Sequence, residues 1–179
     1  MNLLALLNAA SQRYTTVYPS LSQWTVSELA LTSGAVYEVE MEFFNGAGLN
    51  VVHRSHTVVV DITPPVIHSV EFVGGETVTN ENGTDYIAIA TSDRIQLVWS
   101  ASDFDAGISG YIISVRDAAN ASVLPGGAMY YETDGYHAVI DGLQLSVGNH
   151  SNGPFYTVVV KAVNRAGLQS NPFTLPPFL

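Results

Sequence analysis

The sequence contains no cysteine, which excludes disulfide bonds and thiolate metal sites. Positive charge is also scarce, because 6 Lys and Arg stand against 16 Asp and Glu and leave a formal net charge of -10. Nucleic-acid binding requires a basic surface that neutralises phosphates. So few cations exclude nucleic acid as a partner, and the acidic balance also disfavours anionic membranes. An acidic surface is compatible with a divalent cation as a partner.

Charge of either sign is sparse, since Asp, Glu, Lys and Arg make up 12% of the chain against the usual ~25%. Hydrophobic residues make up 47%, enough to bury a core. No stretch approaches the ~20 apolar residues of a membrane span, so we expect no membrane insertion. Residues 1–11 mimic a signal peptide, but they lack a positive start and their apolar run is short. An ordinary buried segment is the simpler interpretation.

An internal repeat organises the chain. Residues 37–49 and 156–168 match at a constant offset of 119, with identical Tyr, Val, Asn, Ala, Gly and Leu at corresponding positions. About one identity is expected by composition in so short a window, so the match indicates duplication.

Each copy begins with a period-two alternation that predicts a strand with one buried and one wet face. In the first copy the apolar positions are Tyr37, Val39, Met41 and Phe43, and the acidic positions are Glu38, Glu40 and Glu42. A helix would scatter the three Glu around its axis. Asn-Gly-Ala-Gly then ends the strand, because Asn and Gly tolerate positive φ.

A further strand is expected over 57–62, followed by Thr63-Pro64-Pro65. Two prolines cannot continue a sheet ladder, so the sequence predicts a stiff linker that separates residues 1–62 from residues 63–179. Short strands with turn signals between them fill the second part, and no amphipathic helix is evident. The expected strands are 66–73, 86–90, 95–101, 109–115, 128–132, 136–140, 155–164 and 168–175. This pattern predicts an all-β sandwich.

The run from Trp99 to Tyr111, the later Tyr156-x-Val-x-Val strand and the Asp-x-Thr-Pro-Pro joint resemble fibronectin type III or immunoglobulin-like tandem repeats of large extracellular proteins. The resemblance implies that Trp99 and Tyr111 fill the core between two sheets. It places Tyr156, and by the repeat Tyr37, at the corner that leads into the penultimate strand. It also implies an extracellular or cell-surface location and neighbouring repeats as partners.

The first copy has only 36 residues before Tyr37, too few for the Trp strand and its partners. We therefore expect 1–62 to be a partial, C-terminal half of a module, with strands near 24–31, 36–44 and 57–62, followed by one complete module over 63–179. The apolar face of such a half-sheet needs a cover. Either residues 2–10 fold over it as a short helix or strand, or the chain is a fragment that associates.

Asp103 and Asp105 flank a turn that ends at Gly107. Paired carboxylates on a loop between strands are candidate calcium ligands, although Asp and Gly are also ordinary turn formers. We expect no other cofactor. His53 and His56 lie three apart without the further ligands that zinc requires.

Three sequons place candidate glycosylation sites at Asn82, Asn120 and Asn149, and ordinary turn asparagines are the alternative. Trp99 shares its strand face with apolar neighbours, so it is expected in the core rather than on a sugar-stacking surface. Tyr130 and Tyr131 are adjacent, and one of them must therefore face outward.

No nucleophile elbow, phosphate-binding loop or acid pair in a cleft is present in the sequence. We expect no enzymatic activity. The first hypothesis is a structural or adhesive spacer module of an extracellular or cell-surface repeat protein. The alternative is a protein-binding or carbohydrate-binding module that serves an enzyme outside this chain.

Overall fold

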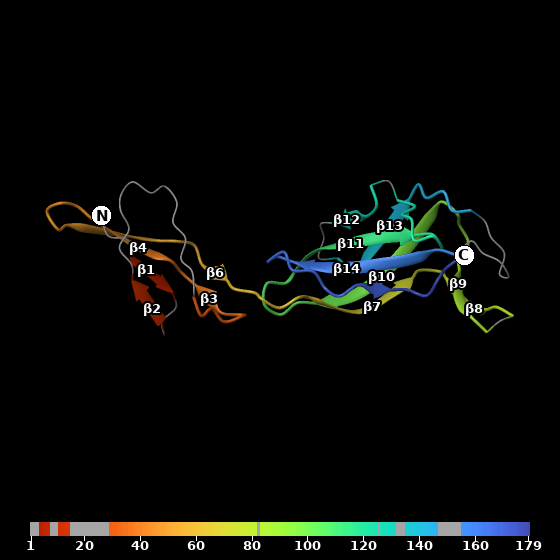
Figure 1. The fold of residues 1–179 in the computed structure, drawn as a ribbon, viewed down its shortest axis with the longest axis horizontal. Coiled ribbons are helices and arrows are strands. Elements are labelled where there is room, and N and C mark those ends of the chain that lie inside the picture. The colour runs from red at the N-terminus through yellow and green to blue at the C-terminus, as the bar shows by residue number, and fades with distance from the viewer. Residues whose placement is uncertain are drawn as a thin grey trace. The chain divides into compact units, whose positions relative to one another are not determined.

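A computed structural model describes residues 4–7, 11–14, 29–81, 83–124, 126–131, 135–146 and 155–179. All regular secondary structure among these residues is β (Figure 1), which confirms the predicted fold class. The chain divides into two compact units, Met1–Ile62 and Thr63–Leu179. The division falls at the Thr-Pro-Pro segment, where the sequence placed its linker.

Unit 2 is a β-sandwich of a three-stranded and a four-stranded antiparallel sheet, ordered β13-β10-β7 and β12-β11-β14-β15. The strands of the first sheet are β7 (Val66–Phe72), β10 (Arg94–Ser102) and β13 (His137–Asp141). Those of the second are β11 (Ile108–Arg116), β12 (Met129–Tyr131), β14 (Thr157–Asn164) and β15 (Phe173–Thr174). The chain changes sheet between β10 and β11, between β12 and β13 and between β13 and β14, which is the connectivity of immunoglobulin-like sandwiches.

The core of unit 2 lies between these sheets and follows the period of two. Val158, Val160 and Ala162 of β14 are fully buried, as is Leu97 of β10. Trp99 is 3% exposed and packs on Tyr111 with ring centroids 4.6 Å apart, while its indole Nε1 donates to the carbonyl of Gly135 at 3.2 Å. Trp99 and Tyr111, which the sequence placed in the core, are thus both buried between the sheets.

A hairpin of β8 (Glu76–Thr79) and β9 (Asp85–Ala88) lies between β7 and β10 in the chain, and β8 was not predicted. The C-terminal segment pairs with β9 through a parallel bridge between Ile87 and Phe178. Phe178 is fully buried against Phe72 and Tyr156, with ring centroids at 5.1 and 5.7 Å. Its backbone exchanges two hydrogen bonds with Tyr156, and Leu179 N donates to Ile87 O. The last residues thus close one end of the sandwich.

The described residues of unit 1 form short two-stranded ladders. These are β1 (Leu4–Leu7) with β2 (Ser11–Tyr14), β3 (Val36–Tyr37) with β6 (Val58–Val59), and β4 (Glu40–Phe44) with β5 (Asn50–Arg54). The strand expected over 57–62 is therefore only two residues long, and β5 was not predicted. Val39 interrupts the expected strand over 36–44, because its N–H donates to the Ser55 hydroxyl instead of to a ladder carbonyl. Of the strand expected over 24–31, residues 24–28 lie outside the described residues.

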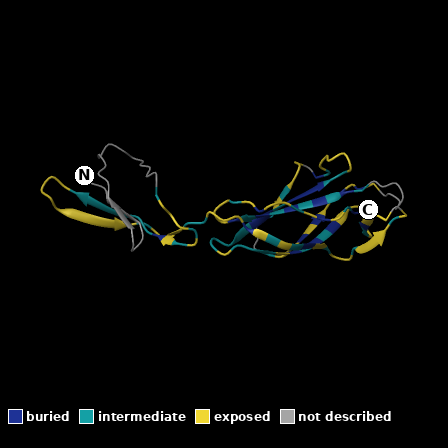
Figure 2. Ribbon diagram, turned by 60° about the horizontal axis from the view of Figure 1, so that its bottom comes forward, coloured by how far each residue is buried: buried dark blue, intermediate teal, exposed yellow. Residues whose placement is uncertain are grey.

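The expected division of β4 into a buried and a wet face is wrong. Tyr37 is buried, at 6% exposed, but all five residues of β4 are half-buried and all five of β5 are exposed (Figure 2). Large apolar side chains stand exposed in this unit: Leu31, Val36, Leu49, Val51, Val52, Val58, Val59 and Ile62. Alternation creates two faces, but a face is buried only when another layer packs on it. Strand β1 contacts β4, but among the described residues of unit 1 there is no three-stranded sheet like the one that covers β14.

One five-residue turn recurs four times in the described chain. It starts at Asn45, Asn80, Asp117 and Asn164. In each case the first residue's side-chain oxygen accepts from the backbone N–H four residues later, and its carbonyl accepts from the N–H three residues later. The fourth residue has positive φ and is Gly in three turns and Asn120, at φ 63°, in the other. Only Gly and, next best, Asn adopt that conformation readily.

Candidate functional site

Three segments of unit 2 meet at the point where the linker enters the sandwich. They are Thr63, the loop 103–107 between β10 and β11, and the turn 164–168 that follows β14. We call this group the linker latch. The predicted calcium ligands Asp103 and Asp105 both belong to it.

Asp103 organises the loop within which it lies. Its Oδ1 accepts hydrogen bonds from the backbone N–H of Ala106, at 3.0 Å, and of Gly107, at 2.8 Å. Gly107 has φ of 76°, a value that a residue with a side chain adopts at a cost. Asp and Gly therefore act here as the turn formers that the simpler interpretation proposed.

Asn164 connects the loop to the linker. It is 1% exposed, and its Nδ2 donates to Thr63 O and to Asp103 Oδ2, both at 3.1 Å. Its Oδ1 accepts from Leu168 N at 2.7 Å. The amide thus engages the linker and both loops, and a buried amide that loses such partners is costly.

The linker is held by side-chain and backbone groups together. Thr63 Oγ1 donates to Asp105 Oδ2 at 3.0 Å, and the Thr63 carbonyl accepts from Asn164. Pro65 is buried, and proline fixes its own φ. Two hydrogen bonds and one buried ring therefore fix the path of the chain as it enters unit 2.

The calcium hypothesis stays a prediction. Asp103 and Asp105 do lie on one loop, but both oxygens of Asp103 already accept hydrogen bonds. Among the described residues no group of three or more His, Asp or Glu side chains converges. A cation bound here would therefore need backbone carbonyls or water to complete the six to eight oxygen ligands that calcium takes.

Of the three sequon asparagines, only Asn120 lies in a described segment. It is exposed, occupies the positive-φ position of the turn that starts at Asp117, and its Oδ1 accepts from Arg116. Glycosylation at Asn120 stays a prediction. Asn82 and Asn149 fall outside the described residues.

The two repeat tyrosines make the same bond in both units. The hydroxyl oxygen of Tyr156 accepts from Ser146 N at 2.9 Å, and that of Tyr37 accepts from Thr32 N at 2.8 Å. A buried tyrosine that bonds to the backbone a few residues upstream is the tyrosine corner of immunoglobulin-like sandwiches. The two copies of the sequence repeat thus share the same local structure around their tyrosines.

Tyr130 and Tyr131 face opposite ways on β12, as expected for adjacent strand residues. Tyr130 is 54% exposed, and the hydroxyl of Tyr131 donates to Val139 O at 3.1 Å. Burial of the Tyr131 ring, with a smaller contribution from the negative charge of Asp141, raises the pKa of that phenol above its usual 10.0. Only Tyr130 is therefore available as a contact residue of this pair.

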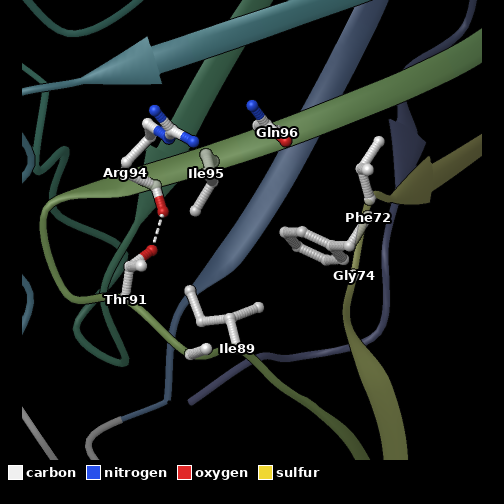
Figure 3. Close-up of a pocket in the computed structure, with 9 residues that line it drawn as sticks. Phe72, Gly74, Ile89, Thr91, Arg94, Ile95 and Gln96 are labelled. Carbon is white, nitrogen blue, oxygen red and sulfur yellow. Dashed lines mark hydrogen bonds between the residues drawn. The ribbon is translucent and has the colours of Figure 1, made fainter.

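A surface hollow of about 190 Å³ lies where β10 begins. Phe72, Ile89 and Ile95 surround its apolar part, and the backbone of Arg94 accepts a hydrogen bond from Thr91 beside it (Figure 3). Sequence patterning did not indicate this hollow. Its lining comes from three segments, residues 72–74, 89–91 and 94–96.

The role of Asn164 also went unrecognised in the sequence. The signal for it was the asparagine shared by both copies of the repeat, which we interpreted only as a turn residue. Its turn function holds in both units. Its second function depends on Thr63, which lies 101 residues earlier.

No family model and no curated protein matches the chain. Among solved structures it is similar to domains A168-A170 from titin, with 18% sequence identity and a TM-score of 0.46. The match covers 79% of this chain and 39% of that one, so the chain spans well under half of the titin structure. The fold assignment rests on the sheet order and the core described above. Among the described residues, there is no helix long and apolar enough to span a membrane.

Proposed function

We propose that this chain is a non-catalytic structural repeat module that sets the spacing and stiffness between neighbouring repeats of one polypeptide. The observation that carries the proposal is the linker latch. A free connection between sandwiches lets them move relative to one another by default. Here the first residue of unit 2 is bonded to two loops, and prolines follow it.

The chemistry of the latch supports a mechanical role. The side chains of Asp103 and Asn164 form hydrogen bonds with backbone groups, including the carbonyl of Thr63, and with each other. In the described residues no buried side-chain N or O atom lacks a partner. A polar cluster of this kind holds a chain in place and has no group poised to attack a substrate.

An extracellular or cell-surface location is part of the proposal. It is supported by the resemblance of the sequence to extracellular tandem repeats and by a surface poor in charge. Expression through a secretory pathway tests it together with the Asn120 sequon. We expect export of folded protein, and retention of misfolded chain would contradict this location.

The test of the spacer function is Asn164→Ala in the full chain, with Asn45→Ala as the matched control at the equivalent repeat position. Backbone amide relaxation by NMR should show greater mobility of residues 61–65 in Asn164→Ala than in the parent. Small-angle scattering should show a wider spread of chain dimensions. Asn45→Ala should change neither. Unchanged mobility of 61–65 in a folded Asn164→Ala variant would remove the latch as the basis of the function.

The alternative, a protein-binding or carbohydrate-binding module accessory to an enzyme outside this chain, is favoured by one observation. Tyr130 and Tyr136 are 54% and 69% exposed, and exposed tyrosines are typical contact residues. Titration with oligosaccharides, followed through the NMR signals of these two residues, tests it. Saturable shifts that Tyr136→Ala abolishes would favour this function over the spacer.

A further inference from the structure

The turn at the tip of the β4–β5 hairpin contains an asparagine followed by a glycine. Asn45 and Gly46 are both exposed, and a Cβ added at Gly46 would meet no atom within 4 Å. Because glycine has no Cβ, no side chain shields its peptide nitrogen from the side-chain amide of a preceding asparagine. Two further Asn-Gly pairs begin at Asn82 and Asn152, which lie outside the described residues. The hairpin tip therefore holds both reactants of a spontaneous deamidation.

This reaction needs only water. The backbone nitrogen of Gly46 attacks Cγ of Asn45, a C–N bond forms, and the Cγ–Nδ2 bond breaks. The proton lost by the Gly46 nitrogen is taken up by the departing amide, which leaves as ammonia. Water then opens the cyclic succinimide at one of its two carbonyl carbons. Attack at Cγ gives aspartate, and attack at the backbone carbonyl gives isoaspartate, in which the main chain runs through Cβ and Cγ.

The closed turn holds Asn45 away from this reaction, but its hairpin has little to keep it closed. The Oδ1 of Asn45 accepts from Ala47 N at 2.9 Å and from Leu49 N at 3.0 Å, so the turn must open before the side chain can rotate into ring closure. Strands β4 and β5 form a two-stranded sheet, and all five residues of β5 are exposed. Two-stranded hairpins are marginally stable, and such regions open locally at low free energy.

The equivalent asparagine of unit 2 is protected twice. Asn164 starts the same turn but is followed by Arg165. It is 1% exposed, and its Nδ2 donates to Thr63 O and to Asp103 Oδ2. Strand β14, which it ends, lies between β11 and β15. Opening this turn therefore requires much of unit 2 to unfold.

A third turn of the same kind shows that a carboxylate fits the first position. Asp117 Oδ1 accepts from Ala119 N at 2.9 Å and from Ala121 N at 2.8 Å, as Asn45 Oδ1 does from the corresponding groups. The aspartate product at position 45 should therefore keep the turn. The isoaspartate product should not, because one extra methylene group enters the main chain between the paired strands β4 and β5.

We propose that Asn45 is a modification site, which deamidates spontaneously through local opening of the β4–β5 hairpin while the equivalent Asn164 stays an amide. The modification adds a negative charge to unit 1 and, in its isoaspartate form, loosens the hairpin irreversibly. The protein thus carries a chemical clock in one copy of its repeat and not in the other. This inference does not depend on the spacer function.

The test is incubation of the folded full chain in mildly alkaline buffer made with isotopically labelled water. Peptide mapping by mass spectrometry then follows each asparagine separately. Asn45 should incorporate labelled oxygen and lose ammonia, and Asn164 should do so at least about tenfold more slowly because it reacts only after a larger opening. Among the separated products, the aspartate form should retain the Leu49 amide signal in NMR spectra, and the isoaspartate form should lose it.

Two matched variants exchange the residue that follows the asparagine. Gly46→Arg copies unit 2 into unit 1 and should slow the reaction of Asn45 about tenfold or more, since a side chain then shields the nitrogen. The site accepts it, because Gly46 lacks a positive φ and has open space around its Cβ position. Arg165→Gly copies unit 1 into unit 2 and should leave Asn164 an amide, because its turn stays buried.

Thermal melts establish that each variant is folded, and the chain unfolded in urea shows how fast each asparagine reacts without structure. Retention of the Asn45 amide in the folded parent, while the unfolded chain loses it, would overturn the proposal. So would a Gly46→Arg variant that reacts at the parent's rate. Reaction of Asn164 in folded Arg165→Gly as fast as that of Asn45 would show that the following residue alone decides, and that hairpin opening plays no part.

Discussion

Strand β4 of unit 1 and strand β14 of unit 2 carry the same repeat but reach different environments. Val39 and Met41 are half-buried, whereas the equivalent Val158 and Val160 are 0% exposed. The residues that pair with the two repeat tyrosines also differ in burial. Val58, paired with Tyr37, is 54% exposed, and Phe178, paired with Tyr156, is fully buried.

The features that survive in both units are local. The tyrosine corner and the asparagine turn each need only a few neighbouring residues, and both are present twice. The feature that differs is burial, which needs β7, β10 and β13 opposite β14. A strand pattern therefore specifies which side chains are available for a core, and the opposing layer specifies whether they are in one.

The largest expected effect follows from removing the centre of the opposing layer. Trp99→Ala should lower the free energy of unfolding of unit 2 by about 3–5 kcal/mol, because it removes the ring that packs on Tyr111. Urea unfolding followed by NMR signals of each unit measures it. Signals of unit 1 should be unaffected. Tyr136→Ala, an exposed aromatic, should cost within about 0.5 kcal/mol, and an equal loss in both variants would contradict the core assignment.

The two repeat asparagines should differ when each is truncated. Asn164→Ala should cost about 1–3 kcal/mol, since it removes a buried amide that joins Thr63 and Asp103 by hydrogen bonds. Asn45 is exposed, and water can replace its bonds, so Asn45→Ala should cost roughly 0.5 kcal/mol or less. Chemical denaturation of the two variants decides it, and similar losses would show that the latch adds nothing to the shared turn.

The calcium hypothesis concerns unit 2 alone, because its carboxylates have no counterparts in unit 1. It predicts that calcium at ten times its dissociation constant adds about 1.4 kcal/mol to the stability of unit 2. Thermal melts with calcium and with chelator measure this, and Asp105→Asn is the variant that should not respond. Identical melts of the parent at millimolar calcium would end the hypothesis.

The tyrosine corners should respond alike in the two units. Tyr37→Phe and Tyr156→Phe each remove one hydrogen bond to a backbone N–H while keeping the ring, so each should cost about 0.5–1.5 kcal/mol. The loss should appear in the unfolding of the unit that carries the substitution. A loss in only one unit would mean that the corner is structurally repeated but not energetically equivalent.

The smallest effect is a dependence on alkaline pH that belongs to unit 2. The raised pKa of Tyr131 means that the folded state holds this proton more tightly than the unfolded state does. Its contribution to stability is complete below the unfolded pKa of about 10 and is lost as pH rises toward the folded value. Tyr131→Phe should remove that part of the alkaline loss, measured by melts on both sides of pH 10, and Tyr130→Phe is the control on the same strand.

Much of unit 2 was predictable because its strands alternate and its turns are marked by Asn and Gly. The Trp99 strand, the Tyr111 strand and the Tyr156 strand all lie where the pattern placed them. Strand β8 was missed because its four residues are all exposed, so no alternation marks it. Strand β5 was missed for the same reason, since all five of its residues are exposed.

The candidate site was also predictable only in part. Asp103 and Asp105 were identified from a short acidic turn, and their use as loop and linker partners became evident only with Asn164 and Thr63 in place. The burial of Phe178 depends on a C-terminal segment that pairs in parallel with β9. No local pattern encodes a contact between residues 87 and 178.

By itself the sequence determined the all-β class, the duplicated strand and turn, the tyrosine corner and the place of the linker, because each depends on dihedral preferences and spacing among near neighbours. The tertiary structure alone decided which copy of the repeat is buried, which groups Asn164 joins, and that the C-terminal segment pairs with β9. Those outcomes depend on the packing of segments far apart in the chain. The free energy gained by that packing exists only once the layers have assembled.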